Sequence, residues 1–157
     1  MMDSGEAQRL IPALRLSPHP EGSWYRETLR VGGPERATVT AIHFLLEAGQ
    51  RSHWHTVDAT EIWCWHAGHP LALGHAASDQ DAPVWITLGP DVAAGNSPQA
   101  TIPAGHWQAA VADLGWALVS CIVAPGFLPD SPWRRRAGCQ ERRTEGRRGL
   151  RPGSSPG

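Results

Sequence analysis

The sequence consists largely of short apolar runs that are separated by clusters of turn residues. Glycine and proline supply 17 and 14 of the 157 residues, about a fifth of the chain, against a usual share of roughly 12%. The runs recur roughly every 8 to 14 residues and are rich in β-branched and aromatic residues, which is typical of strands. Because no helical periodicity interrupts them, they predict an all-β sandwich or barrel. The expected strands are residues 38–46, 61–66, 70–77, 84–88, 99–102, 106–111 and 116–123.

One helix is expected ahead of these strands, over residues 5–16. Ala7, Leu10, Ile11 and Leu14 recur there at helical spacing. Pro12 is expected to kink or end this helix, because proline has no N–H to donate and its ring clashes with the preceding turn. Residues 25–27 are expected to lie on a further, early strand.

The basic residues of the chain are concentrated in its last 24 residues. Residues 1–133 carry six Arg and thirteen Asp or Glu, a net charge of −7, whereas residues 134–157 carry eight Arg and two Glu, a net charge of +6. This last segment has too few apolar residues to offset the entropy of ordering, so we expect a disordered Arg-rich tail after a single domain over residues 5–133. A solvated extension is favoured over a nucleic-acid partner, because the tail has no aromatic residues to stack on bases.

Composition also restricts the compartment. No apolar stretch approaches the roughly 18 to 20 residues that cross a bilayer, and the first residues are polar and acidic, unlike a signal peptide. The three cysteines form no CxxC pair and fit neither a disulfide framework nor a cysteine zinc site. The sequence therefore predicts a cytoplasmic protein with reduced thiols and no membrane partner.

Histidine, glutamate and glutamine residues in two short segments form the candidate site. On one strand His53 and His55 would share a face, and Glu61 lies on the next strand. Gln108 lies on a later strand, after a Pro/Gly turn. Two imidazoles and a carboxylate at one point outline a site for a divalent metal ion, so the candidate metal ligands are His53, His55, Glu61 and Gln108. His55 and Glu61 are also candidates for acid–base catalysis, because burial shifts the pKa of ionisable groups.

Six ordered segments of the chain carry a family resemblance, which spans about residues 8–128. They are HPEGSWYRET (19–28), AIHFLL (41–46), SHWHTVDATEIWCW (52–65), LGPDVAAG (88–95), PQATIPAGHWQAA (98–110) and LVSCIVAPGF (118–127). Together they resemble the small single-domain cupins of unknown function, whose pattern includes WHR, DEIW, PAGxWQ and VAPGF. The sequence departs from it where Thr56 replaces the Arg, and Gln108 stands where the second cupin motif has a ligand His.

The resemblance implies a jelly-roll (cupin) β-barrel, commonly a homodimer formed by sheet extension, with a pocket in the mouth of the barrel. Around that pocket Arg26, Trp63, His106 and Gln108 are the candidate ligand-binding residues. Arg26 would hold a carboxylate or phosphate, with pairing to an acidic neighbour as the alternative. Trp63 would stack on a sugar or base, with core filling as the alternative.

Three functions follow from this candidate site. The first is a small-molecule-binding protein with isomerase- or epimerase-like activity on a sugar or related polar metabolite, in which His55 moves a proton and Glu61 orients it. The second is a ligand-binding or storage-type cupin that turns nothing over. The third is a metal-dependent cupin enzyme, such as an oxygenase or a lyase. A fold alone does not choose among them.

Overall fold

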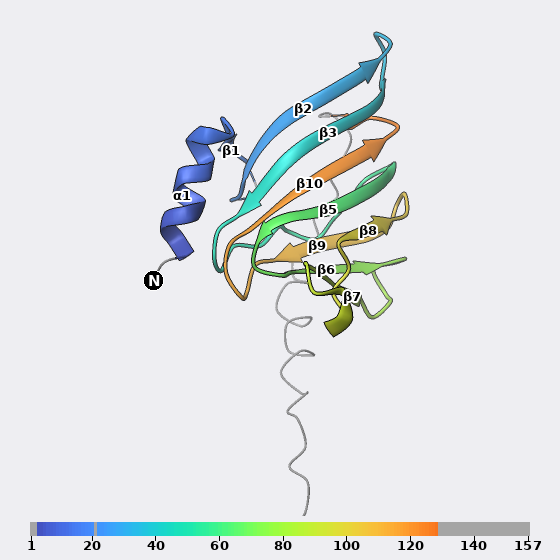
Figure 1. The fold of residues 1–157 in the computed structure, drawn as a ribbon. Helices are drawn as coiled ribbons and strands as arrows, with labels where there is room; N and C mark the ends of the chain where they lie inside the picture. Colours follow the sequence, from blue (N-terminus) through green and yellow to red (C-terminus); the bar gives the residue numbers. More distant parts are fainter. Residues whose placement is uncertain (1–2, 21, 129–157) are drawn as a thin grey trace, which may run out of the picture.

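The computed structural model describes residues 3–20 and 22–128, and their strands form two separate hydrogen-bonded sheets (Figure 1). The larger sheet has six strands in the order β1-β2-β3-β10-β5-β8. They are β1 (Ser17–Pro18), β2 (Trp24–Gly32), β3 (Ala37–Leu46), β10 (Ala117–Ala124), β5 (Thr60–Gly68) and β8 (Gln99–Ile102). The smaller sheet, in the order β4-β9-β6-β7, contains β4 (His55–Thr56), β9 (Trp107–Val111), β6 (Leu71–Ala76) and β7 (Val84–Leu88).

The predicted all-β jelly roll is confirmed, as a sandwich of two sheets rather than a closed barrel. All seven expected strands are present, within a few residues of the expected bounds. The two-residue strand β1 was not expected, because a pattern that short carries no periodicity. The strand expected to carry both His53 and His55 is present as β4, but it begins only at His55. A 3₁₀ turn, η1 (Val92–Ala94), precedes β8.

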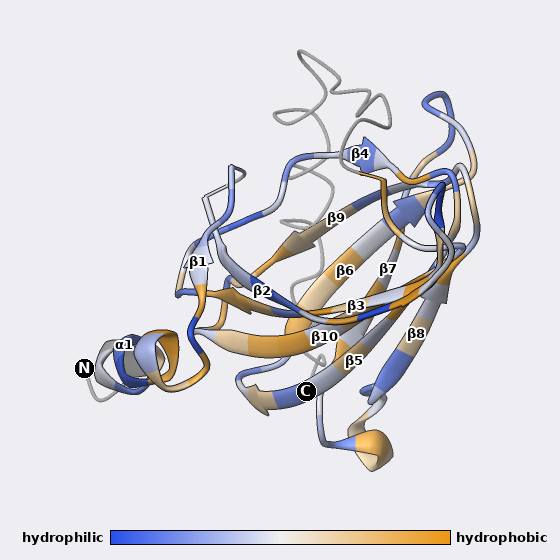
Figure 2. Ribbon diagram, turned by 90° about the horizontal axis from the view of Figure 1, so that it is seen from above, coloured by the Kyte–Doolittle hydropathy of each residue, from blue (hydrophilic) through white to orange (hydrophobic). Residues whose placement is uncertain are grey.

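The core lies between the two sheets and follows from the alternation of side chains along each strand. In β10, Ala117, Val119, Cys121 and Val123 are buried, and the residues between them are more exposed. The largest fully buried side chains come from both sheets, and they include Leu46, Leu71, Leu73, Leu88, Ile102 and Val119. Figure 2 shows the corresponding hydrophobic segments on the strands of both layers.

The helix α1 (Asp3–Ala13) packs on the outer face of the larger sheet. Its Ala7 is buried in a cluster with Leu16, Leu45 and Trp116. The expected helix is confirmed but ends three residues early. The Leu16 N–H donates to the carbonyl of Ile11 at 2.8 Å, and Arg15 adopts a φ of 53°, which is the left-handed geometry that commonly closes a helix.

Strand β2 contains an irregularity that changes which residues face the core. Glu27 pairs with Ile42 of β3, but the next pair along is Leu29 with Ala41, so Thr28 is the extra residue of a β-bulge. Beyond the bulge, Arg30 pairs with Thr40 and lies on the same face as Glu27. Strict alternation would have placed these two side chains on opposite faces.

Two predictions remain open at this level. Residues 129–157 lie outside the described residues, so the Arg-rich tail and a domain boundary at residue 133 stay predictions. Within the described part of the chain, no helix is long and apolar enough to cross a membrane.

Candidate functional site

A pocket of about 210 Å³ opens at one end of the sandwich, on the inner face of the larger sheet. His55 comes from β4 in the smaller sheet, and Glu61 comes from β5 in the larger one. The other polar residues that line the pocket are His19, Tyr25, Glu27, Arg30, Thr40 and Cys121. The apolar ones are Ile42, Val57, Val123 and Phe127. The pocket is smaller than the roughly 300 to 1,000 Å³ of drug-sized ligand sites, so it suits a small metabolite.

Glu61 is the buried ionisable group of this pocket, with only 7% of its surface exposed. Burial raises its pKa from an ordinary 4.5 to about 7, and hydrogen bonds from Gln108 and Cys121 act in the opposite direction. The Gln108 Nε2 donates to Glu61 Oε2 at 2.5 Å. Burial also raises the pKa of the Cys121 thiol well above its ordinary value, so this thiol keeps its hydrogen. Near neutral pH, Glu61 is therefore able both to donate and to accept a proton.

Gln108 holds Glu61 in place and is itself held by Trp63. The indole Nε1 of Trp63 donates to Gln108 Oε1 at 2.9 Å. An indole N–H can only donate, so the amide oxygen must face Trp63 and the amide NH₂ must face Glu61. Both residues are almost completely buried, at 1% exposed for Gln108 and 2% for Trp63. Gln108 and Trp63 therefore position the carboxyl group and do not line the pocket.

A backbone contact defines which ring nitrogen of His55 carries the hydrogen. Its Nδ1 lies 2.8 Å from the backbone carbonyl oxygen of His53. A carbonyl only accepts, so Nδ1 carries the hydrogen, and the neutral ring has its lone pair on Nε2. The strand pairing sets His55 directly opposite Gln108, which is hydrogen-bonded to Glu61. The predicted catalytic pair, His55 and Glu61, thus lines one pocket, and each of the two residues neighbours Gln108.

The remaining polar wall combines aromatic rings with an ion pair. The His19 ring meets the edges of Tyr25 and Phe44 at centroid distances of 5.0 and 5.7 Å. Arg30 donates from Nε and Nη2 to the two carboxylate oxygens of Glu27, each at 2.8 Å. A ligand would therefore meet an aromatic side, a charged pair and the hydroxyl of Thr40.

None of the four predicted ligand-binding residues lines the pocket: Gln108 lies behind Glu61, and the other three lie elsewhere. Arg26 is on the outer face of β2, where its Nη1 donates to the Leu14 carbonyl at 3.3 Å. His106 stacks on His75 at a centroid distance of 5.7 Å and is not part of the pocket lining. Trp63 is a core residue that does not line the pocket and is linked to Glu61 through Gln108.

The predicted metal centre is not assembled. Among the described residues, no three His, Cys, Asp or Glu side chains are gathered so as to hold a metal ion. His53 precedes β4, so no strand places its imidazole on one face with that of His55. The carbonyl oxygen of Gln108 already accepts from Trp63. Of the four predicted ligands, His55 and Glu61 line the pocket, fewer than the three protein ligands of a typical catalytic zinc site, so the donors do not fit a resident divalent ion.

Several residues that line the pocket were not predicted from the sequence, chiefly His19, Arg30 and Thr40. Arg30 was not predicted because the bulge at Thr28 turns its side chain toward the pocket, and hydrophobic periodicity does not reveal a bulge. Thr40 lies within an apolar run and reads as an ordinary strand residue. His19 belongs to HPEGSWYRET, one of the six segments that carry the family resemblance, and this was the signal that could have identified it.

A salt bridge between Arg36 and Asp58 connects the loops at the mouth of the pocket. Arg36 donates to both carboxylate oxygens of Asp58, at 2.8 and 3.0 Å, and its Nε donates to the Gly126 carbonyl at 2.8 Å. This guanidinium lowers the pKa of Asp58. Next to it, Val57, Ala59, Val123 and Phe127 form a small apolar cluster, so the mouth has its own packing.

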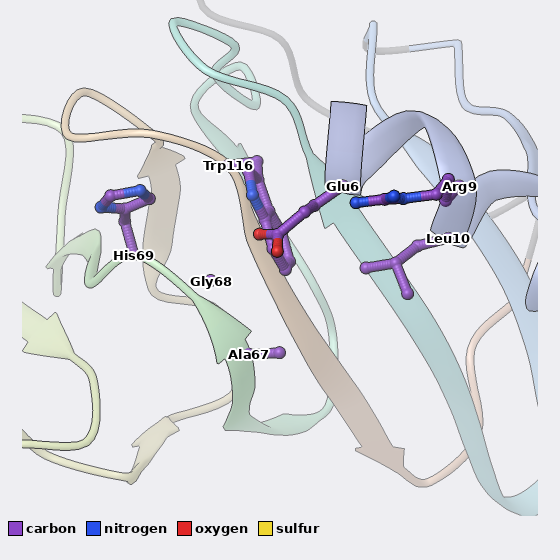
Figure 3. A pocket seen from close by; sticks show the side chains of 7 residues that line it. All are labelled: Glu6, Arg9, Leu10, Ala67, Gly68, His69 and Trp116. Atoms are coloured by element: carbon purple, nitrogen blue, oxygen red, sulfur yellow. The ribbon is translucent and has the colours of Figure 1, made fainter. Parts of the chain in front are cut away.

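A second cavity, of about 560 Å³, lies between α1 and the ends of β5 and β10 (Figure 3). Glu6, Arg9 and Leu10 of α1 face Gly68, His69 and Trp116 across it. Glu6 and Arg9 are exposed, and none of the predicted site residues lies there. The inner pocket therefore remains the candidate functional site.

A two-sheet jelly roll with a polar pocket between its layers is the architecture of a cupin. The family model described as Cupin superfamily (DUF985) matches residues 8–131. The chain belongs to this family, as the resemblance predicted. A search of the curated proteins found no match.

Solved structures support the same assignment. A protein from Shewanella oneidensis is 33% identical, with a TM-score of 0.75 over 87% of this chain and 86% of its own. A hypothetical protein from Leishmania major is 32% identical, with a TM-score of 0.71 over 78% of this chain and 82% of its own. A variant of oxalate decarboxylase from Bacillus subtilis is similar in fold alone, with 14% identity and a TM-score of 0.57 over 74% of this chain and 29% of its own.

Proposed function

We propose that this cupin binds a small polar carbonyl compound, such as a sugar, and catalyses a proton transfer on it of the isomerase or epimerase type. One observation carries the proposal. A buried carboxyl group whose pKa is about 7 and an imidazole with a defined basic nitrogen line the same small pocket. Pairs of this kind perform general acid–base catalysis at neutral pH.

The chemistry requires only groups that the pocket contains. His55 Nε2 takes a proton from the carbon next to the carbonyl, while protonated Glu61 donates its hydrogen to the carbonyl oxygen. The product of this step is an enol. Return of a proton to the opposite face of the same carbon, with the enol hydrogen passing back to the Glu61 carboxylate, completes an epimerisation. In an α-hydroxy carbonyl compound the enol is an enediol, and a proton added to the former carbonyl carbon, with the hydrogen of the other hydroxyl passing to Glu61, completes an isomerisation. Gln108 and Trp63 hold the Glu61 carboxyl in place throughout.

The test is exchange of substrate hydrogen in heavy water. The full-length protein is incubated in D₂O with single aldoses, ketoses and small keto or hydroxy acids, and loss of the C–H signal next to the carbonyl is followed by proton NMR. We expect exchange with at least one compound. His55→Ala should slow it by about 10² to 10⁴, the usual contribution of a positioned base. His69→Ala, a substitution outside the pocket, serves as the matched control.

The ligand-binding alternative makes a different prediction in the same experiment. A storage-type cupin would be protected against thermal unfolding by a compound from the panel, and His55→Ala would remove that protection, without any exchange. Protection without exchange would therefore replace the catalytic proposal with the binding one. Exchange that survives in His55→Ala would contradict the assigned role of His55.

Metal analysis of protein purified without a His-tag tests the third function. Because the donors do not fit a resident ion, we expect well under one equivalent of any divalent metal. About one equivalent, lost in both His55→Ala and Glu61→Gln, would contradict the metal-free proposal.

A further inference from the structure

A cluster of hydrogen-bonding side chains lies on the outer face of the larger sheet, away from the pocket. Arg26 of β2 pairs with His43 of β3, and His43 pairs with Ser120 of β10. Residues directly opposite each other on neighbouring strands share a face, so these three side chains form a row. His66 of β5 joins the row, with its Nε2 2.6 Å from Ser120 Oγ. We call Arg26, His43, Ser120 and His66 the outer-face cluster.

The cluster has polar atoms for which the described residues provide no hydrogen-bond partner. The Nδ1 of His43 is buried and has no hydrogen-bond partner there. Of the five N–H donors of the Arg26 guanidinium, one makes a hydrogen bond in the described structure, at 3.3 Å to the Leu14 carbonyl. The rings of His43 and His66 are 6.3 Å apart. An unsatisfied buried polar group is costly, which makes an acceptor from outside favourable.

The charged groups of the outer-face cluster are all basic. The pKa of His43 is lowered first by burial and then by the positive charges of His66 and Arg26. Glu27, the neighbour of Arg26 in the chain, faces the pocket and binds Arg30. Cys64 of β5 pairs with Ser120 on the same face, and burial raises its pKa, so its thiol stays neutral. The cluster itself therefore contains donors and positive charge but no carboxylate.

We propose that the outer-face cluster is a second ligand site, which binds a tetrahedral oxyanion such as a phosphate group. Arg26 would hold two of its oxygens, as guanidinium groups commonly do. His43 would donate to a third oxygen from Nδ1. With His66 donating from Nε2 to Ser120 Oγ, the serine hydroxyl hydrogen is left to donate to the anion as well.

The site should bind more tightly at lower pH. An anion beside His43 offsets the positive charges of Arg26 and His66 and favours the protonated imidazole. If one proton is taken up with the anion, the dissociation constant rises up to about tenfold per pH unit above the pKa of free His43. Sulfate is the appropriate probe, because its own charge does not change over this range.

The test is a sulfate titration of the full-length protein, followed by NMR of the histidine Cε1–Hε1 signals. Ionic strength is held constant with sodium chloride, so that screening does not contribute. We expect saturable shifts of His43 and His66 and tighter binding at pH 5.5 than at pH 7.5. Arg26→Gln, at an exposed position, should weaken binding at least tenfold, whereas Arg51→Gln, which removes the same charge elsewhere, should leave it unchanged.

Two outcomes would overturn the proposal. One is a set of shifts that sodium chloride reproduces, and the other is equal binding by the Arg26→Gln and Arg51→Gln variants.

Inorganic phosphate and ribose 5-phosphate then distinguish the source of the phosphate group. Tighter binding of the ester identifies a phosphorylated metabolite, and equal binding identifies the free anion. Because the cluster and the pocket lie on opposite faces, failure here leaves the proposed reaction untouched.

Discussion

Glu61 gives the protein a pH dependence that runs against the usual behaviour of an acidic side chain. Its pKa in the folded state is about 7, against an ordinary 4.5, so between these values the folded state binds the proton more tightly than the unfolded state. The free energy of unfolding therefore falls as the pH rises from about 4.5 to 7, by about 3 kcal/mol at most. Below this range the contribution of Glu61 is constant.

Glu61→Gln tests this directly. Gln can keep an oxygen toward Gln108 and does not titrate, so we expect the variant to lose this part of the pH dependence. Above pH 7 it should be more stable than the unmodified protein by up to about 3 kcal/mol. Urea unfolding at pH 5, 6, 7 and 8 measures the effect, with Glu6→Gln on the exposed side of α1 as control. Parallel stability curves for Glu61→Gln and the unmodified protein would refute the burial argument.

At the scale of elements, the close approach of β5 and β10 depends on a single glycine. Gly68 has a φ of 89°, and a Cβ there would lie 2.3 Å from the Trp116 carbonyl oxygen. Gly95, after η1, has a φ of 92° and open space around it. Gly95→Ala should cost about 1 to 2 kcal/mol for the left-handed backbone alone. Gly68→Ala should cost about 1 to 3 kcal/mol more, because the added methyl overpacks the contact.

Urea unfolding of both alanine variants measures this difference. The two sites share their backbone geometry and differ in the space around the glycine, so each variant serves as the other's control. Equal losses of stability would mean that the contact with Trp116 relaxes without cost.

The strands were predictable from the sequence where the pattern of apolar and turn residues marks them. The seven expected strands have turn-rich boundaries, and burial alternates strictly along β8 and β10. His55 and Glu61 lie in a segment that carries the family resemblance, and the fold brings them to one pocket. The bulge at Thr28 was not predictable, because a single extra residue leaves no pattern. It moved the basic side chain of the pocket from the expected Arg26 to Arg30. His53 was misjudged for a related reason, since β4 contains only two residues.

At the scale of the whole molecule, homodimer formation stays a prediction. β1 pairs only with Trp24 and Tyr25 of β2, so the rest of β2 is an edge of the larger sheet. Leu29 and Val31 on this edge are 45% and 50% exposed. We expect a second copy to add along β2, since an unpaired edge with apolar side chains invites strand pairing.

Sedimentation equilibrium of two lysine variants tests this surface. Val31→Lys should weaken the dimer at least tenfold, because it places a charge in the interface. Val92→Lys changes a residue that is 63% exposed on η1 and should have no effect. A monomer at all concentrations, or equal dimerisation of both variants, would rule out this edge.

The hydrogen-bond chain behind Glu61 also determines where its proton can go. Trp63 donates to Gln108 and Gln108 donates to Glu61, and neither an indole nor an amide gives up its hydrogen near neutral pH. The Cys121 thiol is protonated as well. The core side of the carboxyl is thus closed to protons, and exchange with water runs only through the pocket. A molecule seated there therefore stops Glu61 from exchanging its proton with water and becomes the partner to which that proton passes.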